Sequence, residues 1–331
     1  MNQQRLAQTP PDLRGLRVLV TGASGFVGAN LCRALLHAGG SVHAAVRPAS
    51  DLFRLAEVRR EVELHSFDLC DVEGVRRELA AVRAEVVIHA AAHTTVHYNA
   101  TVAGVAGDTI IATAHLLDAL AMVGCERLVH VGSSLEYGPA ARPHREDDPL
   151  RPDTLRGATK AAAALLVLQQ AIRGAVAAVV VRPFSIYGPW EGEHRLVPRA
   201  IQAAFSGETL PLTGPGLRRD LVYVEDVCDA CLCAAVAEAV VGEVINVGTG
   251  RQTSNEDLVA AVERATGRSI RVAPGAFPAR SADRGFWAAD TGKAERLLGW
   301  AASYPLAAGL ERTVRWFESH RRPAGAPGAG R

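Results

Sequence analysis

Three glycines near the start of the chain have the spacing of a phosphate-binding loop. Gly22, Gly25 and Gly28 follow a strand-like apolar run, 17–20, and a helical pattern begins among them. The first glycine permits a tight turn, the second lets the backbone approach a pyrophosphate, and the third lets the helix pack close to a sheet. Backbone N–H groups at the helix start then face the anion. This pattern predicts a dinucleotide site formed by Gly22, Ser24, Gly25, Phe26, Val27 and Gly28.

Arg47 stands at the end of the second predicted strand, where the ribose of a bound dinucleotide lies. Enzymes that use NAD usually place Asp or Glu there, yet no acidic residue occurs from Gly40 to Ser50. A guanidinium at this position can pair with a 2′-phosphate. Arg47 therefore favours NADP(H) over NAD(H) as the cofactor.

Strand-like and helical segments alternate through the first half of the chain. The predicted strands are 17–20, 41–46, 62–66, 85–89, 127–131 and 176–182. Repeated strand–helix units predict an α/β fold, a Rossmann-type doubly wound parallel sheet that binds ligands at the carboxyl ends of its strands. Prolines then punctuate shorter elements, which indicates a smaller C-terminal substrate-binding lobe. We expect a disordered leader at 1–15, the cofactor domain at 16–183, the lobe mainly at 184–322 with 244–248 returning to the main sheet, and a disordered tail at 323–331.

Composition limits the classes of partner. The 331 residues carry a net charge of about +1, so bulk electrostatics predict no nucleic acid or membrane partner. We find no apolar run near the ~20 residues of a membrane span and no signal peptide. Cys228, Cys231 and Cys233 lie in an apolar helical pattern and lack a fourth ligand at zinc spacing, so no metal is predicted. A reduced, cytoplasmic protein with a small-molecule substrate is the expectation.

Several further motifs resemble those of the extended short-chain dehydrogenases/reductases, the NAD-dependent epimerase/dehydratase type. They cover almost the whole chain and include Thr21–Gly28, Asp68-Leu69, Ala90-Ala91-Ala92, Ser133 to Gly138, Arg182-Pro183 to Pro189, and Arg219 to Val227. The resemblance implies that the Asp68-Leu69 pair contacts adenine and that Ala90, Ala91 and Ala92 lie along the cofactor. It also places Pro183 beside the nicotinamide. Ser133 and Lys160 take catalytic positions, and Lys160 also binds the nicotinamide ribose.

Arg156 occupies the position where the resemblance implies a proton-transferring tyrosine, four residues before Lys160. An arginine stays protonated and is therefore a poor general acid and a worse base. Alcohol oxidation, epimerisation and dehydration all need a base, whereas carbonyl reduction mainly needs a hydrogen-bond donor such as Ser133 for the developing negative charge. We therefore expect an NADPH-dependent ketoreductase whose proton comes from a substrate hydroxyl or water. The pattern is similar to atypical family members that reduce angucyclinone-type aromatic polyketides in antibiotic biosynthesis.

Two other functions stay open. Arginines that match Arg219 and Arg280 contact the nucleotide diphosphate in sugar-nucleotide members, which favours a nucleotide-sugar ketoreductase, epimerase or dehydratase. A cofactor-binding pseudoenzyme is the second alternative. Further candidates for the substrate pocket are His93, Ser134, Arg156, Tyr187 and Trp190, with His97, Tyr137 and Phe184 as weaker ones. The apolar helices 103–123 and 157–172 allow either a monomer or a homodimer.

Overall fold

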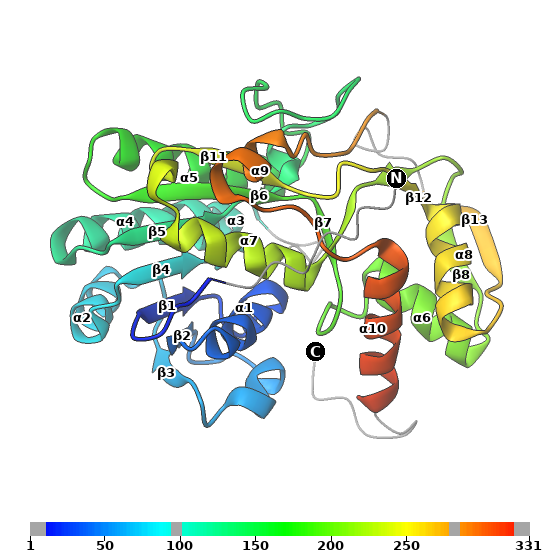
Figure 1. Ribbon diagram of the computed structural model, residues 1–331, viewed down its shortest axis with the longest axis horizontal. Coiled ribbons are helices and arrows are strands. Elements are labelled where there is room, and N and C mark those ends of the chain that lie inside the picture. The colour runs from blue at the N-terminus through cyan, green and yellow to red at the C-terminus, as the bar shows by residue number, and fades with distance from the viewer. Residues whose placement is uncertain (1–10, 94–100, 278–284, 321–331) are drawn as a thin grey trace.

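The computed structural model describes residues 11–93, 101–277 and 285–320. Its centre is a parallel sheet of seven strands in the order β11-β6-β5-β4-β1-β2-β3 (Figure 1). The order reverses direction beside β1, where doubly wound sheets bind ligands. The strands are β1 (Arg17–Thr21), β2 (Ser41–Val46), β3 (Glu63–Ser66), β4 (Val86–His89), β5 (Arg127–Val131), β6 (Ala178–Pro183) and β11 (Val244–Val247).

Helices cover both faces of this sheet, as the alternating pattern predicts. One face packs on α1 (Phe26–His37) and α7 (Val224–Val236), with α9 (Gly292–Leu298) at the β11 end. The other packs on α2 (Val72–Val82), α4 (Ala112–Val123) and α5 (Leu155–Ile172). The central strands are buried on both faces, which explains why they read as continuous Val/Leu/Ile runs rather than alternating ones. The cysteines at 228, 231 and 233 lie on α7.

A smaller lobe lies beside the carboxyl ends of the strands (Figure 1). Its own core joins α6, α8 and α10 to the two-stranded sheet of β8 and β13. The bounds are α6 (Leu196–Ser206), β8 (Leu210–Thr213), α8 (Asn255–Thr266), β13 (Val272–Phe277) and α10 (Leu306–Ser319). The segment 244–247 leaves the lobe and pairs with β6 in the main sheet, as predicted.

Short elements connect these layers. Two small pairings, β7 with β10 and β9 with β12, lie between sheet and lobe. Their bounds, with those of the short helical turns, are β7 (Ser185–Tyr187), β9 (Arg218–Arg219), β10 (Leu221–Tyr223), β12 (Thr253–Ser254), α3 (Val102–Ala106), the π-helix η2 (Gly107–Ile111), and the 3₁₀ turns η1 (Phe53–Val58), η3 (Ser134–Glu136) and η4 (Glu238–Val240).

One sequence expectation needs correction. Part of the predicted disordered leader is ordered, because Leu13 is fully buried and its N–H donates to the Ala38 carbonyl; residues 1–10 and the predicted tail at 323–331 lie outside the described residues. The continuous helix Val102–Val123 has 22 residues and contains an 18-residue stretch with a mean hydropathy of 1.3, so length and composition alone would let it cross a membrane. This is weak evidence for a span, since α4 within it packs on α2 and α5.

Candidate active site

The glycine loop and the turn after β4 meet at the carboxyl edge of the sheet. Gly22 has φ +69°, and a Cβ there would lie 2.7 Å from the Ala91 nitrogen. A Cβ on Gly28 would overlap the Gly22 carbonyl oxygen. Gly25 is the N-cap of α1, and no side chain caps that helix. The first-turn N–H groups are therefore open to an anion, so this segment fits the pyrophosphate of a dinucleotide.

Arg47 and Asp68 come from neighbouring strand ends and line one cavity. This cavity of about 320 Å³ is formed by Arg47, Pro48, Ala49, Ser50 and Asp68. It follows β2 and β3, where the sequence predicted the adenosine end of the cofactor. The Arg47 guanidinium also lies 3.6 Å from the Asp108 carboxylate. A 2′-phosphate would compete with that carboxylate for the arginine.

His93 belongs to the same corner. Its Nδ1 lies 2.8 Å from the Asp108 carboxylate, and its backbone N–H donates to the Thr109 hydroxyl. Because Asp108 contacts both Arg47 and His93, the histidine lies towards the predicted ribose end of the cofactor. Its predicted contact with substrate gains no support from this arrangement.

Ser133 is held with its hydroxyl proton available. The residue caps the 3₁₀ turn η3: its Oγ accepts from the Leu135 N–H at 3.2 Å, and its own N–H donates to the Glu136 carboxylate at 2.7 Å. That carboxylate forms a fully buried ion pair with Arg182, at 2.6 Å. No acceptor for its O–H is found among the described residues, so the hydroxyl can donate to a substrate carbonyl.

Lys160 approaches the same strand end from α5. Its ammonium donates to the Val131 carbonyl at 2.6 Å, two residues before Ser133. Burial, together with the charge of Arg156, lowers the pKa of Lys160 to about 8, while Glu136 opposes the shift. The predicted catalytic pair thus shares one end of β5.

Arg156 lies one helical turn before Lys160 and adds a second positive charge. Its Nε is buried without a hydrogen-bond partner, and no carboxylate of the described residues pairs with it. Burial first, and then the charge of Arg195, lowers the pKa of Arg156. Its own charge contributes to lowering the pKa of His194 as well as that of Lys160. The region around Lys160 is therefore a cationic centre that would favour an anion or a developing oxyanion.

Neither predicted tyrosine is free to act as an acid. The Tyr137 hydroxyl donates to Asn246 at 2.8 Å and accepts from Arg182 at 3.0 Å, and burial raises its pKa to about 12. Tyr187 is buried in the lobe core beside Tyr223, where its hydroxyl donates to the Leu306 carbonyl at 3.4 Å. Tyr187 therefore packs the lobe rather than serving the predicted substrate pocket.

The Trp190 ring also packs against other side chains of the protein and does not face an open site. Its ring meets Trp316 edge-on, with centroids 4.9 Å apart, and the Arg33 guanidinium lies 4.6 Å from the ring centroid. Its backbone has φ +71°, which is unusual for a bulky residue. This aromatic cluster joins α10 to α1, so the prediction that Trp190 stacks on a flat substrate gains no support.

Trp287 is a residue that sequence reasoning missed. Its indole N–H donates to the Ser134 hydroxyl at 3.3 Å, and its ring packs with Phe184. The Arg219 guanidinium lies 5.0 Å from the Trp287 ring centroid. Ser134, Phe184 and Arg219 therefore gather around one indole next to Ser133. The only sequence signal was an aromatic residue shortly after Arg280, and Arg280 and His97 themselves lie outside the described residues.

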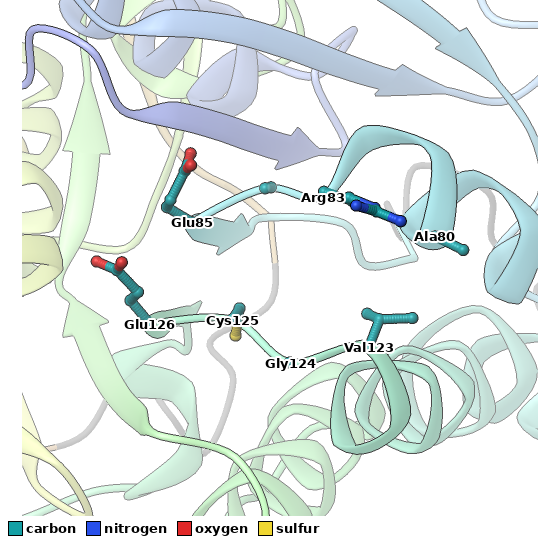
Figure 2. A pocket seen from close by; sticks show the side chains of 8 residues that line it. Ala80, Arg83, Glu85, Val123, Gly124, Cys125 and Glu126 are labelled. Carbon is teal, nitrogen blue, oxygen red and sulfur yellow. The ribbon is translucent and has the colours of Figure 1, made fainter.

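A larger cavity lies at the opposite edge of the sheet. Its volume is about 510 Å³, and Figure 2 shows it between the segments that lead into β4 and β5. It is lined by Ala80, Arg83, Ala84, Glu85, Val123, Gly124, Cys125 and Glu126. Because ligands of such sheets bind at the carboxyl ends of the strands, this amino-end cavity is separate from the candidate active site.

Comparisons with known proteins agree with this geometry. Residues 18–248 match the NAD dependent epimerase/dehydratase family. The chain is similar to a dTDP-glucose 4,6-dehydratase of Streptomyces griseus, at 33% identity over 92% of this chain and 94% of the relative. It is also similar to a UDP-glucose 4-epimerase of Mycolicibacterium smegmatis, at 31% identity over 92% and 99%.

Solved structures extend the same relationship to the fold. The UDP-glucose 4-epimerase of Thermus thermophilus, solved in complex with NAD, superposes with a TM-score of 0.84 at 27% identity and covers 92% of this chain and 100% of that one. The chain therefore belongs to the NAD-dependent epimerase/dehydratase family, and it is an oxidoreductase-type enzyme of that family.

Proposed function

We propose that the protein is a nicotinamide-dependent ketoreductase. The observation that carries this proposal is Arg156, a fixed cation one helical turn before Lys160, together with the absence of any free tyrosine beside Ser133 among the described residues. A bound reduced nicotinamide supplies the hydride. Ser133 donates a hydrogen bond to the carbonyl oxygen as negative charge develops there, and Lys160 and Arg156 stabilise that charge electrostatically.

The residues of the site fit this direction of reaction better than oxidation. Removal of a hydroxyl proton needs a base, and the Tyr137 hydroxyl is held between Asn246 and Arg182 with a raised pKa. Reduction does not require a proton-transferring side chain of the protein, because water or a hydroxyl on the substrate can deliver the proton after hydride transfer. Dehydration and epimerisation of a sugar both begin with an oxidation, so both place the greater demand on this site.

A keto sugar carried by a nucleoside diphosphate is the substrate class we favour. The support comes from the relatives, a dTDP-glucose dehydratase and UDP-glucose epimerases that match over nearly the whole chain. Arg219, beside Trp287 at the wall of the site, is a suitable partner for a diphosphate. This class replaces the aromatic polyketide as the leading expectation.

An aromatic ketone of the angucyclinone type is the second candidate, favoured by one observation. Ser133 offers a hydrogen bond but is too weak an acid to supply a proton, and the Lys160 ammonium already donates to the Val131 carbonyl. A phenol next to the ketone would supply its own proton. The phenolate left behind would lie in the cationic centre at Arg156 and Lys160. A methylated phenol should then react far more slowly; equal rates would exclude this substrate-assisted route.

Two measurements test the proposal and separate the candidates. Incubation with deuterated NADPH or NADH and panels of keto sugar nucleotides and polycyclic ketones should transfer one deuterium to product, read by mass. Tight binding of dTDP or UDP in calorimetry would support the sugar-nucleotide class, and weak binding would favour the aromatic one. Cofactor binding without deuterium transfer to any ketone would instead indicate the pseudoenzyme.

Substitutions test the roles within the site. Ser133→Ala should lower the reduction rate by at least ~100-fold, as for loss of an oxyanion donor. Arg156→Ala should cost less than the ~100-fold typical of losing an acid–base group. A loss beyond ~1000-fold would show that Arg156 itself is the main oxyanion donor.

A further inference from the structure

A second cluster of side chains lies away from the candidate active site, on the strands at one edge of the sheet. His43 on β2 pairs directly with Glu63 on β3, and His65 pairs with Ala45. Residues two apart on a strand point to the same face, so His43, Glu63 and His65 share one face of the two strands. Among the described residues they are the only three His, Cys, Asp or Glu side chains whose ligand atoms lie within 4.8 Å of one another.

The distances between these atoms approach those of a tetrahedral metal site. His43 Nδ1 lies 3.0 Å from His65 Nε2. Of the two Glu63 carboxylate oxygens, Oε2 lies 3.5 Å from His43 Nδ1 and Oε1 lies 3.7 Å from His65 Nε2. Zinc bonds of ~2.0–2.1 Å to nitrogen and oxygen at tetrahedral angles place neighbouring ligand atoms ~3.3 Å apart. Each separation is close to that value, so a small rotation of the exposed Glu63 carboxylate would direct one oxygen at an ion bound between the two imidazoles.

A fourth residue orients one of the imidazoles. Glu78, which reaches over from α2, has its carboxylate 3.4 Å from His65 Nδ1. A proton on Nδ1 directed at this carboxylate leaves the Nε2 lone pair facing His43 and Glu63. Metal-bound histidines commonly have such a carboxylate on their other nitrogen, which fixes the tautomer and makes the ligand more basic.

Burial favours coordination as well. The side chains of His43 and His65 are 9% and 11% exposed, whereas Glu63 is 67% exposed at the rim. The open side at Glu63 gives an ion access and leaves room for a water as fourth ligand.

We infer that His43, His65 and Glu63 form a binding site for a divalent transition metal of the zinc type, with Glu78 as the residue that positions His65. Two imidazoles and one carboxylate suit Zn²⁺ better than the oxygen-seeking Mg²⁺ or Ca²⁺. Bound metal would pin edge strand β3 to β2. Those strands lead into Asp68 and Arg47, which line the 320 Å³ cavity, so the ion would also stiffen the floor of that cavity. The site does not depend on the proposed function.

The test is calorimetric titration of untagged, metal-stripped full-length protein with Zn²⁺. Wild type should bind one equivalent at this site, with no comparable heat from Mg²⁺ or Ca²⁺. Glu78→Gln should weaken binding ~10- to 100-fold, and His43→Gln or His65→Gln should weaken it further. His37→Gln, an exposed histidine on α1, is the matched control and should bind as wild type does.

Two spectroscopic readouts keep the outcome decisive if a variant folds poorly. X-ray absorption of the zinc-loaded wild type should show two imidazole nitrogens and oxygen, with no sulfur. Zinc should also raise the Tm of wild type and of His37→Gln, since a ligand that binds only the native state stabilises it. Sulfur ligation, or full zinc affinity in the folded His65→Gln protein, would overturn the inference.

Discussion

At Lys160 a shifted pKa should appear directly in the rate. The group is positive below about pH 8 and loses its charge above that value. Because we propose that this charge stabilises the developing oxyanion, we expect the reduction rate to fall as pH rises through about 8. Lys160→Arg keeps a cation throughout, so its residual activity should stay flat across the same range. Initial rates at saturating substrate from pH 6 to 10 measure both profiles. Identical profiles for wild type and Lys160→Arg would show that the loss of charge at Lys160 does not set the pH dependence of the rate.

Arg47 is the residue on which we propose that the choice between NADP(H) and NAD(H) depends. Its guanidinium is 63% exposed beside the cavity and can turn from Asp108 towards a 2′-phosphate. We predict that Arg47→Ala weakens NADPH binding by ~10-fold or more, in line with a charge-assisted bond of ~1.5–3 kcal/mol, and changes NADH binding little. Fluorescence titration with both cofactors checks this. Equal losses of affinity for NADPH and NADH would mean that Arg47 does not distinguish the 2′-phosphate. That outcome would agree with the NAD bound in the Thermus thermophilus epimerase.

At the scale of elements, Asp220 ties three loops together beneath the site. Its fully buried carboxylate accepts from the Thr249 N–H and hydroxyl, the Gly250 N–H and the Ala289 N–H, at 2.6 to 3.1 Å. Asp220→Ala leaves these donors without their acceptor, and the Ala289 N–H among them is buried, whereas those of Thr249 and Gly250 are only partly buried. A stranded buried donor costs ~1–3 kcal/mol, and each of the other lost bonds costs less. Urea unfolding should therefore show a loss of at least ~2 kcal/mol. Exposed Glu61→Ala should change stability by less than ~0.5 kcal/mol.

The sequence predicted helices, strands and loops better than it predicted which side chains contact one another in the folded protein. Periodicity and glycine spacing placed the strands, the phosphate loop and the return of 244–247 to the sheet, because those signals are local. The packing of the Tyr187 and Trp190 side chains depends on lobe residues more than a hundred positions away, such as Leu306 and Trp316. Motif spacing could place Ser133 and Lys160 together, but it could not predict the hydrogen bond between Trp287 and Ser134.

At the scale of the whole molecule, apolar side chains remain exposed along the helices that the sequence analysis considered for pairing. Met122 on α4 is 71% exposed, and Leu165 and Ile172 on α5 are 55% and 82% exposed. Such exposure is typical of a face that another chain covers. We propose a homodimer and predict that Leu165→Asp converts it to monomer, read by light scattering. Val272→Asp, an equally apolar but distant site on β13, should leave the mass unchanged.

Trp287 has one more consequence. Its indole N–H donates to Ser134, its ring packs with Phe184, and the Arg219 guanidinium lies 5.0 Å from the ring centroid. Tryptophan emits where reduced nicotinamides absorb, so a reduced cofactor bound beside Ser133 should quench this indole by resonance energy transfer. Comparison with Trp287→Phe would separate that signal from the signals of the other three tryptophans.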